Sequence, residues 1–184
     1  TMTLPATEYI PQMLPSRRAF VAWLMVSVGT LLFVSLTIVA PVAAAAHYDN
    51  LAGTLYHSFG LLCHQLPERS FFIAGQKLAV CSRCTGLYFG FAITILLYPL
   101  FKSLRRSDLP SRKWLIAAAI PLFIDFGLTF SGIWENTHAT RFLTGVLLGS
   151  VVVFYVMPGV IELSLRTWRL GNLRKTQPST HLHE

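Results

Sequence analysis

Long runs of apolar residues, separated by short charged segments, dominate the chain. Four of these runs approach or exceed the roughly 20 residues that an α-helix needs to cross a bilayer. The predicted spans cover residues 19–42, 81–101, 114–134 and 142–163. The pattern predicts an all-α fold, an integral membrane four-helix bundle over residues 19–163. A cytoplasmic N-terminal segment (1–18) and a basic cytoplasmic tail (164–184) would flank it.

The first apolar run has a competing interpretation as a secretory signal. Arg17 and Arg18 precede the run, and the alanines at 43–46 resemble a cleavage region. The apolar core of a signal peptide is only about 7 to 15 residues long, however, and the run over 19–42 is longer. Its length favours an uncleaved membrane helix.

The composition agrees with a membrane protein. Hydrophobic residues make up 53% of the chain and charged residues 12%, about half the charged share of soluble domains. The net charge of +7 could indicate a nucleic-acid partner. The basic residues lie beside the predicted spans, however, where anionic lipids attract them. We therefore expect the lipid bilayer, and no nucleic acid, as the partner of these charges.

The distribution of basic residues predicts the orientation, because short loops rich in Lys and Arg stay in the cytoplasm. If both termini are inside, 11 of the 15 basic residues are cytoplasmic and four lie outside. The cytoplasmic set is Arg17, Arg18, Lys102, Arg105, Arg106, Arg112, Lys113, Arg166, Arg169, Arg174 and Lys175, and the outer set is Arg69, Lys77, Arg83 and Arg141. This predicts a multi-pass protein of the cell membrane, N-in and C-in, with the loop over 43–84 extracytoplasmic.

That outer loop holds all three cysteines of the chain. Cys81 and Cys84 form a CxxC pair, which places two thiols on one turn, and Cys63 precedes Cys81 by 18 residues. The apolar segment over 51–62 is too short to cross a bilayer. It predicts an interfacial or re-entrant helix that carries Cys63 and His64 to the membrane surface.

Three cysteines and a histidine suit zinc, which prefers sulfur and nitrogen ligands in a tetrahedral arrangement. The expected ligands are Cys63, His64, Cys81 and Cys84. His57 is a substitute for His64, because neighbouring side chains such as Cys63 and His64 chelate awkwardly. Four protein ligands would make the site structural, as in an accessory subunit among other membrane-protein subunits. Three ligands and a water would allow catalysis.

Two other interpretations of the cysteines remain open. Cys63 could be a small buried apolar residue, with His64 an ordinary loop residue. Alternatively, the CxxC pair could serve a membrane thiol-disulfide oxidoreductase with a quinone as cofactor. Enzymes of that plan use a second cysteine pair, whereas this chain has only Cys63 left. In the tail, His181 and His183 indicate a solvated segment rather than a metal site.

Asp125 is the single charged residue within the third predicted span. A charge at the bilayer centre costs roughly 2.5 to 3.5 kcal/mol on insertion scales, so we expect Asp125 to face protein or water. The expected partner is Arg141, with hydrogen-bonding neighbours Asn136, Thr144 and Thr85. Such a pair could lock two helices together, or it could serve a transporter or lipid-modifying enzyme.

Basic residues also surround the expected metal site. Arg69, Arg83 and Arg141 make this region electropositive, which predicts an anionic small molecule or lipid headgroup as a partner. Asp125, Arg141 and Arg69 are therefore the candidate catalytic residues.

Two GxxxG patterns, Gly86–Gly90 and Gly145–Gly149, lie in the second and fourth predicted spans. Small residues at this spacing allow helix backbones to approach closely. We therefore expect these two helices to pack against each other.

Three motifs carry a resemblance to a known family. They are Cys63-His64-Gln65, Pro67-x-Arg69-Ser70-Phe71 and Cys81-x-Arg83-Cys84-Thr85-Gly86. The chain resembles a family of small bacterial and archaeal multi-pass membrane proteins catalogued as a domain of unknown function. The resemblance covers about residues 55–150 and continues through Asp125 and the segment Arg141-Phe-Leu-Thr-Gly145.

The resemblance implies a shared fold and a shared set of site residues, without a reaction. That set is Cys63, His64, Arg69, Cys81, Arg83, Cys84, Asp125 and Arg141. Position 129, where the family often has an amide residue, is Thr here. A role for that amide does not carry over to this chain.

Overall fold

Within the residues that it describes, the computed structural model contains four helices that are long and apolar enough to cross a membrane. They are α1 (Ser16–Ala45), α3 (Ser82–Phe101), α4 (Arg112–Phe130) and α5 (His138–Thr176). The structure describes residues 16–104 and 108–176, with side chains described only between 17 and 164. The predicted all-α membrane fold is confirmed. The tail histidines His181 and His183 lie outside the described residues.

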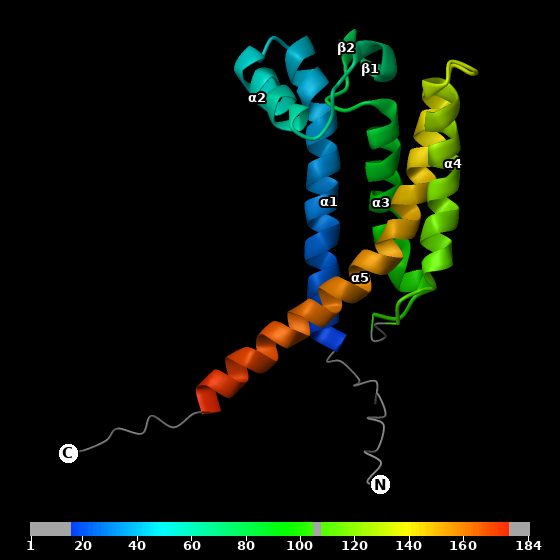
Figure 1. Cartoon of the computed structure of the whole chain (residues 1–184). Coiled ribbons are helices and arrows are strands. Elements are labelled where there is room, and N and C mark those ends of the chain that lie inside the picture. The colour runs from blue at the N-terminus through cyan, green and yellow to red at the C-terminus, as the bar shows by residue number, and fades with distance from the viewer. Residues whose placement is uncertain (1–15, 105–107, 177–184) are drawn as a thin grey trace, which may run out of the picture.

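Helices α3 and α5 form the centre of the molecule, with α1 on one side and α4 on the other (Figure 1). Glycines allow the backbones of α3 and α5 to approach each other closely. A Cβ atom on Gly86 would collide with the carbonyl of Phe142, and one on Gly149 would collide with the carbonyl of Leu87. Gly90 and Gly145 are equally crowded by the opposite backbone. The predicted packing of the two GxxxG helices is thus confirmed.

A proline explains how α1 is fastened to this central pair. Pro99 has no backbone N–H, so the carbonyl of Ile95, one turn earlier in α3, lacks its helical donor. The indole Nε1 of Trp23 in α1 donates a 2.7 Å hydrogen bond to that carbonyl. In a lipid environment, every unsatisfied backbone group is costly, so this bond both satisfies α3 and fixes α1 against it.

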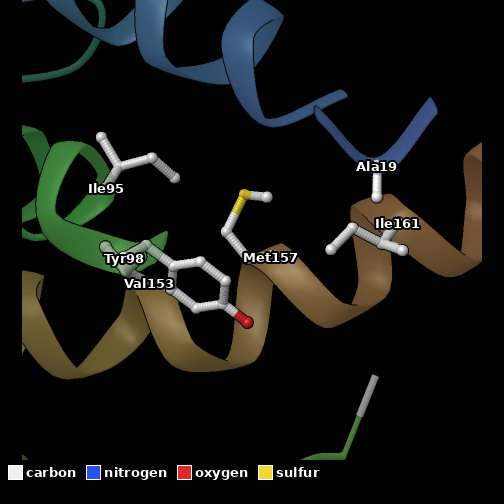
Figure 2. Close-up of a cluster of buried hydrophobic side chains, with 6 residues drawn as sticks. All are labelled: Ala19, Ile95, Tyr98, Val153, Met157 and Ile161. Atoms are coloured by element: carbon white, nitrogen blue, oxygen red, sulfur yellow. The ribbon is translucent and has the colours of Figure 1, made fainter. Parts of the chain in front are cut away.

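Buried apolar side chains gather where α1 begins, α3 ends and α5 passes between them. Figure 2 shows this cluster, which consists of Ala19, Ile95, Tyr98, Val153, Met157 and Ile161. Five of the six are 0% exposed and Ala19 is 1% exposed. Beyond this cluster, α5 continues past the start of α1 (Figure 1).

Helix α4 packs mainly on α5. Ala118 is its single buried residue, so most of its apolar surface is open to lipid. At one end, the Tyr155 hydroxyl of α5 donates to the Ser111 carbonyl at 2.7 Å. At the other end, α4 stops at Phe130, four residues before the predicted limit of 134, where Gly132 adopts a φ of 68° and turns the chain.

The remaining elements cover one end of the bundle, which we call the cysteine end. They are α2 (Asp49–Gly60), a short 3-10 helix (Pro67–Arg69) and the strands β1 (Phe72–Ile73) and β2 (Gln76–Lys77). The strands form an antiparallel hairpin whose two turn residues, Ala74 and Gly75, both have positive φ. Such a turn matches the natural twist of a hairpin. The predicted short helix over 51–62 corresponds to α2.

Candidate metal centre

The three cysteines meet at the cysteine end. The sulfurs of Cys63, Cys81 and Cys84 all lie within 4.8 Å of one another. All three thiols are free, and Cys63 is 7% exposed while the other two are half-buried. Segments separated by 18 residues in the sequence therefore converge on one point.

Cys63 is positioned by the tight turn that follows α2. Its backbone N–H donates to the carbonyl of Phe59, and two residues later Gln65 adopts a φ of 52°, which non-glycine residues rarely do. The Gln65 Nε2 donates to the Tyr56 carbonyl at 2.7 Å, and its own carbonyl accepts a 2.9 Å bond from Lys77 Nζ. These bonds hold the unusual backbone and thereby fix Cys63.

The same residues tie this turn to the hairpin. The Tyr56 hydroxyl donates to the Lys77 carbonyl at 2.5 Å, so Tyr56, Gln65 and Lys77 form a closed set of three hydrogen bonds. Burial raises the pKa of the Tyr56 hydroxyl, which keeps it a donor. Sequence reasoning missed this set, because only Gln65 belongs to a recognisable motif.

The hairpin returns the chain to the start of α3, where Cys81 and Cys84 lie. Leu78, Ala79 and Val80 follow β2 and are buried, at 5%, 0% and 0% exposure. Cys81 is then the N-cap residue of α3, and its backbone N–H donates to the Cys63 sulfur at 3.2 Å. The hairpin and this buried segment thus bring the CxxC pair to Cys63.

The local electrostatics favour a negative charge on one of the three sulfurs, that of Cys63, whereas the partly buried Cys84 donates within the cluster through its thiol. Hydrogen bonds from the thiols of Cys81 and Cys84 lower the pKa of Cys63 well below its ordinary value, and backbone N–H groups of Cys81 and Gln65 add to this effect against the opposing effect of burial. The N-terminus of α3 carries a partial positive charge beside the same sulfurs. Thiolates are the form in which cysteines bind metal ions.

The donor set fits zinc. Three thiolates at tetrahedral zinc lie about 3.8 Å apart, as follows from a Zn–S distance of roughly 2.3 Å. Sulfurs already within 4.8 Å of one another need only small movements to reach that spacing. Zinc and other thiophilic ions are therefore the metals that these residues suit.

Neither predicted histidine belongs to the group of converging ligand atoms found in the described part of the chain. His64 and His57 are both exposed. His64 does line the cavity into which the sulfurs open, whereas His57 does not. Among the four expected ligands, the structure therefore gathers the three cysteines and leaves His64 at the edge.

Asp125 pairs with a different arginine from the one expected. The Nη2 of Arg83 donates to Asp125 Oδ2 at 2.5 Å, whereas the Nε of Arg141 donates to Asn136 Oδ1 at 2.5 Å. Asn136 connects the two, because its Nδ2 donates to the same Asp125 oxygen at 2.8 Å. The predicted Asp125–Arg141 ion pair is wrong, since Asn136 stands between these residues and Arg83 reaches α4 from the first turn of α3.

The threonines expected beside Asp125 are also placed differently. Thr85 donates to the Cys81 carbonyl, and Thr144 donates to the carbonyls of Thr140 and Arg141. Each hydroxyl is used within its own helix, as is common for threonine in membrane helices. Asn136 alone of the three expected neighbours bonds the carboxylate.

One cavity is lined both by the three cysteines and by the hydrogen-bonded group of Arg83, Asn136 and Arg141. It has a volume of about 690 Å³. Its lining includes the three cysteines, His64, the arginines Arg69, Arg83 and Arg141, Asn136 and Thr129, and the apolar residues Leu62, Leu66, Phe126 and Phe130. The cavity thus combines three sulfurs and several positive charges with apolar lining residues, and apolar walls with a few polar groups are usual in small-molecule sites.

Ser82 links the 3-10 helix to α5 beside this cavity, a connection that sequence reasoning missed. Its hydroxyl donates to the Arg69 carbonyl at 2.7 Å and lies 3.1 Å from His138 Nδ1. Ser82 is 0% exposed, and its proton is committed to a carbonyl. This Ser–His contact therefore holds the segment carrying Arg69 and does not form a nucleophile.

Comparison with known proteins places the chain among membrane proteins. Residues 63–155 match the family described as "Predicted membrane protein (DUF2085)". An uncharacterized protein of Methanocaldococcus jannaschii is 40% identical over 115 residues, covering 62% of this chain and 74% of that protein. An uncharacterized protein of Methanothermobacter thermautotrophicus is 37% identical over 91 residues, covering 50% of this chain and 80% of that one. No solved structure matches. The chain therefore belongs to the DUF2085 family of membrane proteins, as the motifs of its cysteine end led us to expect.

Proposed function

We propose that this protein is a membrane metalloprotein whose three cysteines bind one zinc ion at the wall of the cavity. The observation that carries the proposal is the convergence of Cys63, Cys81 and Cys84 to within 4.8 Å at a cavity of about 690 Å³. A structural zinc site is closed by four protein ligands, whereas a catalytic site keeps one position open. Three sulfurs facing a cavity support the second kind.

The roles of the surrounding residues follow from their contacts. The Cys63 sulfur accepts a hydrogen bond from the Cys81 N–H, which favours its thiolate form. The Tyr56–Gln65–Lys77 set holds the turn that carries Cys63 in place. Zinc held in this way would supply a Lewis acid to a molecule in the cavity. His64, exposed at the cavity wall, is placed to bind that molecule or to move a proton.

We further propose that the cysteine end is extracytoplasmic and that both termini are cytoplasmic. An even number of spans puts both termini on the same side. The distribution of basic residues in the sequence favours the inside for that side. Fusing alkaline phosphatase or a fluorescent protein to the C-terminus tests this orientation. We expect fluorescence and no phosphatase activity, and the opposite result would reverse the topology.

Metal analysis on the full-length protein purified in a neutral maltoside detergent tests the zinc proposal. We expect about one zinc per chain, and loss of zinc from each of Cys63→Ser, Cys81→Ser and Cys84→Ser. His64→Ala should retain the ion if the fourth position faces the cavity. Ser58→Ala, an exposed hydroxyl on α2, serves as the matched control. Cobalt substitution adds a test of geometry, because tetrahedral thiolate coordination gives characteristic visible absorption bands.

The same sulfur geometry supports a second candidate, the membrane thiol-disulfide oxidoreductase with a quinone. Three thiols within 4.8 Å would allow Cys63 to attack a Cys81–Cys84 disulfide in a thiol exchange. Thiol counting on the same preparation separates the candidates. Zinc-free protein with one free thiol and one disulfide would overturn the zinc proposal and favour the oxidoreductase.

The third candidate, a transporter or lipid-modifying enzyme that uses Asp125 and Arg141, has less support. The Asp125 carboxylate accepts bonds from Arg83 and Asn136, and its side chain is only 11% exposed. A carboxylate held in this way is better suited to positioning the arginines than to exchanging protons. A role in a complex with other membrane-protein subunits would leave the metal site structural and would require His64 or a partner residue as the fourth ligand.

A further inference from the structure

The arginines of the cavity are not fully neutralised. Arg69, Arg83 and Arg141 line it together, and Asp125 is the single acidic residue bonded to any of them in the described chain. A zinc ion held by three thiolates carries one net negative charge. One positive charge therefore remains even when the metal is bound.

The three arginines differ in how much of their bonding capacity is in use. Arg83 donates to Asp125 through Nη2 while its buried Nε has no hydrogen-bond partner in the part of the chain that the structure describes, and Arg141 donates to Asn136 through Nε. Arg69 is exposed in the 3-10 helix, and within the described residues its guanidinium makes no hydrogen bond or ion pair with a side chain. Its backbone is nevertheless fixed, because Ser82 holds its carbonyl. The free guanidinium is therefore presented from a rigid segment, as an anion site requires.

The apolar part of the lining indicates how the anion arrives. Phe126 and Phe130 lie in the last turns of α4, and they are 52% and 84% exposed. Leu62 and Leu66, on the loop after α2, are 60% and 38% exposed. The mouth of the cavity thus has an apolar rim at the end of a membrane helix, which is the depth of lipid headgroups.

We propose that the cavity binds the phosphodiester headgroup of an anionic phospholipid, with Arg69 and Arg141 contacting the phosphate and the apolar rim contacting the acyl chains. A phosphodiester carries one negative charge, which matches the charge left beside the metal. Arginine is suited to phosphate because its planar guanidinium donates two parallel hydrogen bonds. The inference deepens the proposed function, since it places the headgroup next to the zinc position and makes a phospholipid its substrate or ligand.

Calorimetric titration of the full-length, zinc-loaded protein in neutral maltoside tests the proposal. The probes are dihexanoylphosphatidylglycerol, dihexanoylphosphatidylcholine and inorganic phosphate. We expect the anionic lipid to bind at least about tenfold more tightly than the zwitterionic one, because both carry the same phosphodiester but the arginines repel the choline cation of the second. It should also bind more tightly than inorganic phosphate, which lacks acyl chains. Equal affinity for phosphate would assign the site to a free phosphate compound and overturn the lipid assignment.

Arg69→Gln is the decisive variant, because within the described residues this guanidinium bonds no side chain whose loss would unfold the site. We expect it to weaken binding of the anionic lipid about tenfold or more. Arg112→Gln is the matched control, since it removes the same charge from an exposed position at the opposite end of α4. If both variants bind alike, or if the two lipids bind alike in the unchanged protein, the proposal is refuted.

The zinc content of Arg69→Gln separates this proposal from the one on which it rests. Arg69 is not among the converging metal ligands, so the variant should keep about one zinc per chain. Lost lipid binding with zinc retained supports both proposals. Normal lipid binding with zinc retained refutes the phospholipid site alone. Absence of zinc in the unchanged protein refutes the metal centre, whatever the lipid result.

Discussion

The ion pair between Arg83 and Asp125 gives the sharpest test of how the cysteine end is held together. It joins α3 to α4, two helices whose main packing partner is α5 in each case. The side chains of Arg83 and Asp125 are 22% and 11% exposed. The perturbation is a double-mutant cycle with Arg83→Gln, Asp125→Asn and the combined variant.

The expected magnitude lies between two known limits. Exposed ion pairs contribute about 0.2–1 kcal/mol, and removing one partner of a fully buried pair costs about 3–5 kcal/mol. With exposures of 22% and 11%, we expect a coupling free energy of about 2 kcal/mol. Of the two single variants, Asp125→Asn should lower the free energy of unfolding more than Arg83→Gln. Asp125→Asn leaves Arg83 charged and unpaired, whereas Arg83→Gln leaves the carboxylate still accepting from Asn136.

Unfolding in mixed maltoside and dodecyl sulfate micelles, followed by far-UV circular dichroism, measures these free energies. A parallel cycle with Arg112→Gln and Asp125→Asn is the control, because Arg112 lies at the other end of α4 and should show coupling below about 0.5 kcal/mol. A coupling below that value for Arg83 and Asp125 as well would refute the reasoning. So would a larger cost for Arg83→Gln than for Asp125→Asn.

Three further predictions follow from the packing and the site. Gly149→Ala should cost about 1–3 kcal/mol of unfolding free energy in the same assay, because its Cβ meets the Leu87 carbonyl, whereas Gly159→Ala on the same helix meets nothing within 4 Å and should be neutral or stabilising. Trp23→Phe should cost about 1 kcal/mol, and less in a Pro99→Ala background, where the new N–H can satisfy Ile95; an unchanged cost would contradict our account of this bond. Gln65→Leu should lower zinc affinity about 10- to 100-fold in a chelator competition, since it removes the bond that holds the turn after Cys63; unaltered affinity would argue against a metal centre built on that turn.

The sequence was sufficient for the membrane spans and for contacts that a particular residue type or spacing commonly makes. A helix can cross the bilayer when its own run of apolar residues is long enough to span it. Four spans could therefore be predicted before any packing was known. The GxxxG contact was also readable, because small residues at this spacing have one common use in membranes. The convergence of the three cysteines was predictable because thiols that bind one metal ion must lie close together.

Only the tertiary structure decided which side chains meet across the helices. Arg83 lies between Cys81 and Cys84 in the sequence, yet residues on a helix turn by about 100° each, so its side chain leaves α3 in a different direction from theirs and reaches Asp125 on α4. That contact depends on the rotation and relative depth of α3 and α4, which both rest on α5 and on the turn that carries Asn136. The closed set of Tyr56, Gln65 and Lys77 likewise needs α2 and the hairpin side by side. The sequence therefore predicts the spans and those contacts that a residue type or spacing commonly makes, whereas a specific pair such as Arg83 and Asp125 depends on how the helices are packed.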